Sequence, residues 1–140
     1  MYKKLLLLTL VLSLYSNCFS QGTALLSAQQ MPVFKGGNDS ISNYMAFVLN
    51  THPEFLSKIS FSGKCYITFV IDEDGKMEKP RLIKGISDQK KMNEIILESL
   101  EKLQPWEAGA NNGSNVRVAL SYYFYVKQIG SKFTVKITDH

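Results

Sequence analysis

The sequence contains few of the residues from which catalytic and metal sites are built. Its 140 residues include two cysteines and two histidines, and neither His52 nor His140 has a Cys or His partner at ligand spacing. Nucleophile-elbow, P-loop, dinucleotide-binding and zinc-protease motifs are absent. His52 would be the obvious general base, but it precedes Pro53 at a predicted helix end, where a structural role is the simpler interpretation. We therefore predict no enzyme, no cofactor and no metal.

The chain has one long apolar run, Leu5–Tyr15, which follows two lysines and precedes small residues at positions 18 and 20. This pattern is typical of a secretory signal peptide. As a helix, the run reaches about 16 Å, well short of the roughly 30 Å hydrocarbon core, which argues against a retained anchor. We predict a signal peptide over residues 1–20, cleavage before Gln21, and a protein of the periplasm or cell envelope with no membrane span.

Lipidation of Cys18 is the alternative for this N-terminus, but Tyr15-Ser16-Asn17 is a poor match to the small residues that precede a lipidated cysteine. Cleavage would leave one cysteine, Cys65, which excludes an intrachain disulfide. Because Cys65 lies on the apolar side of a strand pattern, we interpret it as a buried, inert thiol rather than a reactive one.

Charge of one sign is not in large excess either. The formal net charge of +4 falls to +2 when Lys3 and Lys4 are removed. Basic and acidic residues alternate along the chain, as on an ordinary solvated surface. Such a mild charge gives no support to a nucleic-acid partner.

Two amphipathic helices are predicted. The first covers residues 39–50, with Asn38 or Asp39 as N-cap, and the second covers residues 88–103, with Ser87 as N-cap. Their apolar faces comprise Ile41, Tyr44, Met45, Val48 and Leu49 in the first helix and Met92, Ile95, Ile96, Ser99, Leu100 and Leu103 in the second.

Alternating apolar residues predict strands over 64–71 and 116–126, and Pro80 makes the returning strand 76–84 an edge strand or a bulged one. Residues 132–138 alternate as a fourth strand would. We predict an α+β, two-layer domain, in which two helices pack on one face of a small antiparallel sheet of three strands, or four with the last segment. The domain covers residues 31–127, after a short tether at 21–30 and before an extension at 128–140.

Several segments, taken in order, resemble the C-terminal domain of the TonB family, especially its short form. The resemblance covers Met31 to Val126 and rests on Met31–Gly37 (MPVFKGG), Thr51-His52-Pro53, the hairpin Gly63–Gly75 (GKCYITFVIDEDG), Gly85, Pro105–Gly109 (PWEAG) and Gly113. His52, Met92-Asn93 and Ala108 depart from the family pattern. A full TonB also has a membrane anchor and a proline-rich linker, so the resemblance implies the binding domain alone.

In that family the last strand lies beside the first strand of the hairpin, and its region pairs with a short peptide of outer-membrane receptors. The resemblance therefore implies a periplasmic module of TonB-dependent transport that binds an extended peptide at the edge of strand 116–126. Partner-binding residues would be Arg117, Ser121, Tyr123 and Tyr125, which face away from the helices. The alternative interpretation is that Tyr123 and Tyr125 merely cover the second face of the sheet.

Two further hypotheses remain open on the sequence alone: an orphan envelope interaction or assembly domain that binds no TonB box, and an enzyme of unrecognised type. Trp106 is interpreted as a core residue rather than a site residue, because it follows the second helix directly. Residues 132–138 could form a hairpin with strand 116–126 and cap the edge that the family's peptide uses. Such a cap would block the edge permanently or yield to a tight partner.

Overall fold

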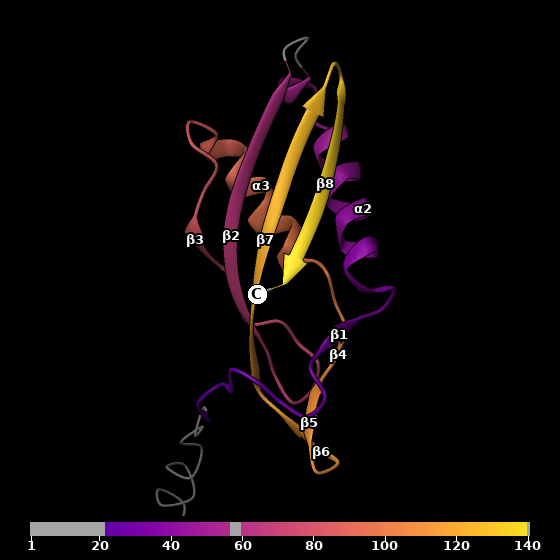
Figure 1. The fold of residues 1–140 in the computed structure, drawn as a ribbon, viewed down its shortest axis with the longest axis vertical. Helices are drawn as coiled ribbons and strands as arrows, with labels where there is room; N and C mark the ends of the chain where they lie inside the picture. Colours follow the sequence, from indigo (N-terminus) through magenta and orange to yellow (C-terminus); the bar gives the residue numbers. More distant parts are fainter. Residues whose placement is uncertain (1–21, 57–59, 140) are drawn as a thin grey trace, which may run out of the picture.

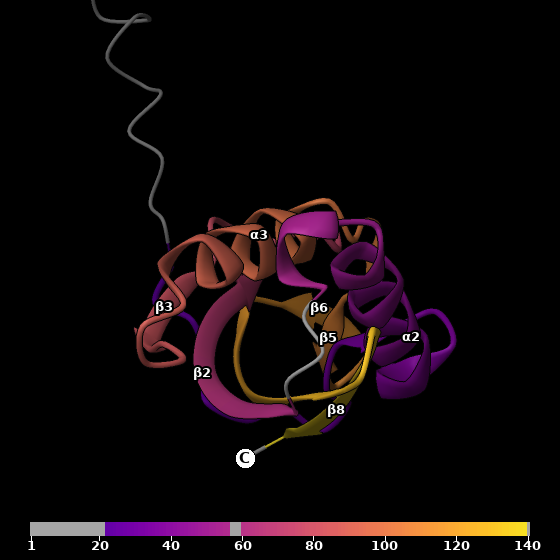
Figure 2. The same ribbon diagram turned by 90° about the horizontal axis from the view of Figure 1, so that it is seen from above.

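The computed structural model describes residues 22–56 and 60–139, so the predicted signal peptide lies outside the described residues. In this part of the chain, a four-stranded antiparallel sheet carries two α-helices on one face (Figures 1 and 2). The elements are β1 Val33–Phe34, α2 Gly37–Asn50, the 3-10 helix Pro53–Phe55, β2 Phe61–Ile71, β3 Arg81–Lys84, α3 Lys90–Glu101, β4 Trp106–Glu107, β5 Gly109–Asn111, β6 Ser114–Val116, β7 Val118–Ile129 and β8 Lys132–Asp139. The α+β prediction is confirmed, in its four-stranded form.

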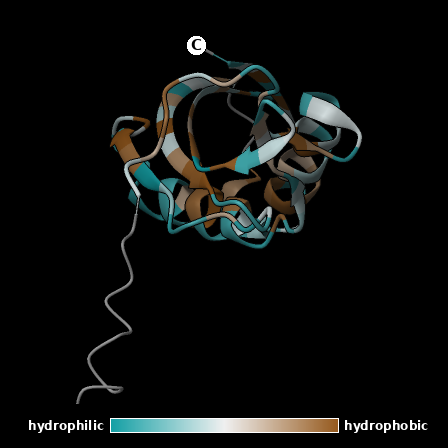
Figure 3. Cartoon of the chain, turned by 90° about the horizontal axis from the view of Figure 1, so that it is seen from below, coloured by the Kyte–Doolittle hydropathy of each residue, from teal (hydrophilic) through white to brown (hydrophobic). Residues whose placement is uncertain are grey.

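The core lies between the sheet and the helices. The inward side of β2 consists of Cys65, Ile67, Phe69 and Ile71, all buried, as the alternation predicts. From β7, Val118, Leu120, Tyr122, Phe124 and Val126 join them, and the helices add Ile41, Met45, Leu49, Met92, Ile96 and Leu100. Apolar and polar bands alternate along the strands (Figure 3). The period-two pattern therefore predicted the buried face of both long strands.

Both helices begin elsewhere than predicted. Gly36, with φ 87°, is the N-cap of α2, so neither Asn38 nor Asp39 caps it. Gln89, not Ser87, is the N-cap of α3. The later start of α3 has a local cause, because the buried Asn93 side chain accepts from the Ile86 N–H and donates to the Ile86 carbonyl, both at 2.9 Å. These bonds fix the main chain of the loop at Ile86, so the helix begins only after this loop.

The returning strand is shorter than the predicted span 76–84. β3 covers only Arg81–Lys84, and Pro80 lies buried just before it. β3 is one edge of the sheet, so the edge position that the proline predicts is confirmed. The hairpin turns at Gly75, with φ 77°, where a Cβ would lie 2.0 Å from the Trp106 carbonyl oxygen. Only glycine fits that turn.

Residues 22–30, expected to be a tether, are bonded to the domain. Leu25 forms a parallel bridge with Val118, and Gln30 an antiparallel bridge with Ala110. The Gln29 side chain also exchanges hydrogen bonds with the turn at Asn112. The segment therefore forms part of the lower end of the molecule (Figure 1).

The C-terminal segment forms the other edge of the sheet. β8 pairs with β7 over its whole length, from Ile129 opposite Lys132 to Tyr122 opposite Asp139. The predicted turn at 128–131 is tighter than expected, because β7 continues to Ile129 and only Gly130 and Ser131 lie between the strands. Phe133 and Ile137 are buried, at 1% and 7% exposure, so β8 supplies side chains to the core.

Candidate binding surface

The edge of β7 that the family resemblance points to is occupied. One side of β7 pairs with β2, and the other pairs with β8 from Tyr122 to Ile129 and with Leu25 at Val118. A peptide cannot pair along this edge while β8 is in place. The four residues expected to flank such a peptide therefore have other surroundings.

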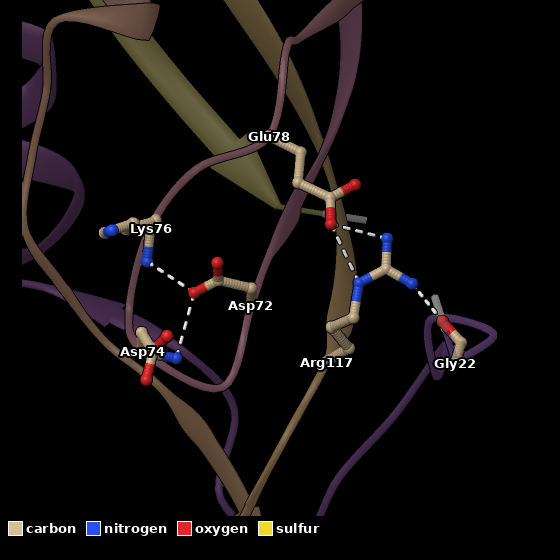
Figure 4. A network of polar contacts seen from close by, with 6 residues as sticks. All are labelled: Gly22, Asp72, Asp74, Lys76, Glu78 and Arg117. Carbon is tan, nitrogen blue, oxygen red and sulfur yellow. Dashed lines mark hydrogen bonds and ion pairs between the residues drawn. The ribbon is translucent and has the colours of Figure 1, made fainter. Parts of the chain in front are cut away.

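The guanidinium of Arg117 is bonded within the protein, to Glu78 and to the N-terminal segment, and is not free to contact a partner. Its Nε and Nη2 donate to the same Glu78 carboxylate oxygen, at 2.8 and 2.5 Å, and its Nη1 donates to the Gly22 carbonyl (Figure 4). Its side chain is only 14% exposed. Figure 4 also shows Asp72, whose carboxylate accepts from the N–H groups of Asp74 and Lys76 and orders the adjacent turn. The predicted role of Arg117 in partner binding is not supported by these contacts.

Tyr123 and Tyr125 lie on the face of the sheet that the helices leave open. Tyr123 stacks on Tyr66, with ring centroids 4.6 Å apart and an interplanar angle of 24°. Tyr125 lies 6.4 Å from Tyr123 and is 41% exposed. Lys64 places its Nζ 4.7 Å from the Tyr123 centroid and 5.5 Å from that of Tyr125. These rings both cover the second face of the sheet and offer an aromatic surface.

Ser121 lies at the lower end of the same face. It is half-buried and faces Thr68 across β2 and β7. It borders a hollow of about 370 Å³ between the N-terminal segment and the end of β8, near Leu26, Pro32 and Asp139. Ser121 and the two tyrosines share a face, as expected. Arg117 borders a hollow with Thr68, Arg81 and Ala119 of the same face, but Glu78 holds its guanidinium.

Positive charge surrounds the tyrosines, a grouping that the sequence alone did not predict. Across the sheet, Tyr125 lies opposite Lys64 on β2 and opposite Lys136 on β8. Tyr66 lies opposite Lys84 on β3. Charges that alternate along the chain thus separate in space, and the expectation of an ordinary mixed surface is wrong for this face. Only the strand register could have revealed this grouping.

A shallow groove runs along the same face between β7 and β8. It measures about 490 Å³ and is lined by Tyr125, Lys127, Thr134, Val135, Lys136 and Thr138. Tyr125, Lys127, Thr134, Lys136 and Thr138 gather there because side chains directly opposite in an antiparallel pair point to the same face. Val135 is the exception, since it is opposite the buried Val126. The groove joins the tyrosine surface to the outer edge of the sheet.

On the outer edge of β8, the main-chain N–H and C=O groups of alternate residues point away from β7. The Phe133 N–H donates to Oδ1 of Asn50 at 2.8 Å, and Nδ2 of Asn50 donates to the Phe133 carbonyl at 3.2 Å. Because alternate residues of a strand direct their main-chain groups to the same side, Val135 and Ile137 also direct theirs outward. Among the described residues, no strand pairs with this side of β8.

The remaining candidates from the sequence are structural. Trp106 is 4% exposed, which confirms its interpretation as a core residue. The imidazole Nδ1 of His52 lies 3.1 Å from a carboxylate oxygen of Glu54, and its ring packs near Phe55. The backbone first, then His52 and Lys91, lower the pKa of the exposed Glu54 to about 2. This cluster ties the loop after α2 to α3.

Cys65 is expected to react with thiol reagents only after unfolding. Its side chain is 1% exposed, and burial raises its pKa to about 12. Burial, with a smaller effect of Asp139, likewise raises the pKa of Tyr122 to about 12. Both pKa values lie above those of the unfolded chain, so their contribution to stability is complete below about pH 8.5 and is lost as the pH rises toward 12.

Thiol labelling at about pH 8 with and without denaturant checks the first expectation. Urea denaturation at increasing pH checks the second, since the midpoint should fall above about pH 9. Rapid labelling of the folded protein would show that Cys65 is accessible.

Within residues 22–56 and 60–139, no helix is long and apolar enough to cross a membrane, and no group of three acidic, His or Cys side chains is arranged to hold a metal ion. Comparison with protein-family models, curated proteins and solved structures found no match to this chain. The resemblance to the TonB family therefore stays a prediction.

Proposed function

We propose that this protein is an exported, non-catalytic binding domain that adds an extended segment of a cell-envelope protein to the outer edge of β8. The observation that carries the proposal is the pair of hydrogen bonds between Asn50 and Phe133. A side-chain amide there makes with the outward main chain the contacts that a peptide strand would make.

α2 lies beside the outer edge of β8 (Figures 1 and 2), and Asn50 at the end of α2 bonds the main chain of Phe133. β8 is also eight residues long, whereas β3 at the opposite edge has four residues and an irregular register with β2. A short, irregular edge is a poor template for an added strand. These features favour β8 as the receiving edge.

A TonB-type role, in which the peptide of an outer-membrane receptor pairs with β7, is the second candidate. It is supported by the resemblance of Met31–Val126 to the TonB C-terminal domain. It requires β8 to leave β7, which would expose Phe133 and Ile137 to water. Exposing two buried side chains costs about 3–6 kcal/mol. This cost favours an orphan envelope module with its peptide site on β8.

The test uses Val135, whose N–H points outward. Proline at this position removes that donor but leaves the β7–β8 hydrogen bonds in place, because prolines are tolerated on edge strands where the N–H faces solvent. Val135→Ala is the matched control, because it shortens the same side chain and keeps the N–H. Both variants should fold, which circular dichroism checks.

The tagged protein would be incubated with solubilised envelope proteins and with synthetic receptor-derived TonB-box peptides. We expect one captured protein to bind Val135→Ala as tightly as it binds the original chain. The same protein should bind Val135→Pro at least tenfold more weakly than the original chain, a difference of about 1.4 kcal/mol. Equal binding to both variants would refute strand addition at β8. If a TonB-box peptide binds and protects the outward amides of β7 from hydrogen exchange, the second candidate is correct.

A further inference from the structure

The four strands of the main sheet contain almost no acidic residues. Their single carboxylate side chain is Asp139, at the end of β8. Six cations lie on the side of the sheet opposite the helices, as the cross-strand register places them: Lys64, Arg81, Lys84, Lys127, Lys132 and Lys136. We call this surface the basic face.

Among the described residues, the cations of the basic face have no carboxylate partner, although Lys64 lies over the rings of Tyr123 and Tyr125. Within residues 22–56 and 60–139, the ion pairs of 4.0 Å or less involve His52, Lys90, Lys91 and Arg117, none of which belongs to the basic face. The acidic residues gather elsewhere, on α3 at Glu94, Glu98 and Glu101 and in the turn at 72–74. The basic face therefore carries a local excess of positive charge despite the small net charge of the protein.

We propose that the basic face docks an acidic, extended segment of a protein partner. Cations without a carboxylate partner, grouped around a tyrosine cluster, complement the carboxylates of a partner, and they steer an anionic partner toward this face. Along a strand, side chains on one face repeat at about 7 Å, the same interval as alternate residues of an extended peptide. A groove lined by Tyr125, Lys127 and Lys136 lies on this face between β7 and β8.

A protein segment fits this face better than a lipid surface. The centre of the face is formed by tyrosines, with Thr68, Thr134 and Thr138 around them. Hydroxyl-bearing side chains accommodate a hydrated, hydrogen-bonding partner, whereas surface helices and loops that enter lipid present apolar side chains. This inference goes beyond strand addition and does not require it, because Val135→Pro alters the edge and not the basic face.

The probe is a labelled peptide of about twelve residues in which Glu alternates with Thr, compared with the same peptide carrying Gln for Glu. Fluorescence anisotropy measures its binding to the original chain, to Lys64→Glu/Lys136→Glu and to Lys35→Glu/Lys90→Glu. The last pair changes the net charge equally but lies outside the basic face, and Lys90 is 93% exposed. All four lysines are exposed, so both double variants should fold.

At about 0.05 M salt we expect Lys64→Glu/Lys136→Glu to bind the Glu peptide at least tenfold more weakly than the original chain, and the control pair to stay within about threefold. The Gln peptide should bind at least tenfold more weakly, and about 1 M salt should remove the difference. Equal weakening by both double variants would overturn the proposal, because attraction would then be set by net charge. Lysine-dependent binding to phosphatidylglycerol vesicles, without peptide binding, would overturn it in favour of a lipid surface.

Discussion

Replacing Phe133 by alanine is expected to lower the free energy of unfolding by about 3–5 kcal/mol, as other buried Phe-to-Ala changes do. Phe133 is 1% exposed and packs edge-on against Phe55, with ring centroids 6.5 Å apart. Its main chain is also held by both polar atoms of the Asn50 side chain. Removing the ring leaves a cavity in the corner where β8, α2 and the loop after α2 meet.

The matched control is Phe47→Ala, the same chemical change on the exposed side of α2. Phe47 is 65% exposed, so its loss should change stability by no more than about 0.5 kcal/mol. Urea denaturation of both variants measures the difference. A small effect at Phe133 would mean that β8 is loosely attached, and the TonB-type role that requires β8 to detach would regain support.

This result also bears on the idea that residues 132–138 form a detachable cap. Truncation after Lys127 would remove Phe133 and Ile137 from the core together with the edge strand. If such a truncated chain bound a peptide differently, the change could result either from the opened edge of β7 or from a destabilised fold. The burial of β8 favours permanent coverage of β7 over coverage that yields to a partner.

Trp106→Ala is expected to lower the free energy of unfolding by a similar amount, about 3–5 kcal/mol. The indole lies 5.3 Å from the ring of Phe34 and 5.4 Å from that of Phe69, measured between centroids. Its Nε1–H donates to the Leu103 carbonyl at 2.8 Å, so its polar atom is satisfied inside the core. The substitution would remove this bond along with roughly 200 Å² of buried surface.

Trp106→Phe serves as the control, since it keeps an aromatic ring and loses the N–H and part of the volume. We expect it to cost about 1–2 kcal/mol, less than half of the alanine effect. Denaturation monitored by far-ultraviolet circular dichroism is suitable, because the variants lack the single tryptophan whose fluorescence would otherwise report unfolding. Equal stability of all three proteins would show that position 106 does not anchor the core.

The parts of the fold that the sequence predicted correctly are those in which apolar residues recur at a regular spacing. β2 and β7 each bury one face. Apolar residues therefore alternate with outward-facing residues from Cys65 to Ile71 and from Val118 to Val126. Helix ends depended instead on single contacts. Asn93 binds Ile86 from within α3, and no pattern before that helix announces such a bond.

The candidate site was predicted only in part, for a related reason. Tyr123 and Tyr125 follow from the alternation of one strand, and the structure places them on the predicted face. The neighbouring cations come from three other strands, at Lys64, Lys84 and Lys136, and they meet the tyrosines only through register. Arg117 continues the same alternation, but its position depends on Glu78, 39 residues away in the chain.

The order of the strands also sets the order in which the chain can fold. β2 pairs with β7 over eleven residues, from Phe61 opposite Gln128 to Ile71 opposite Val118, so its main partner is made long after it. Pairings between such distant segments form slowly, because a long loop must close first. Until residues 118–139 are available, the inward faces of β2 and both helices have no sheet to close over them. We therefore expect the sheet of a nascent chain to be completed only after residues 118–139 have been made.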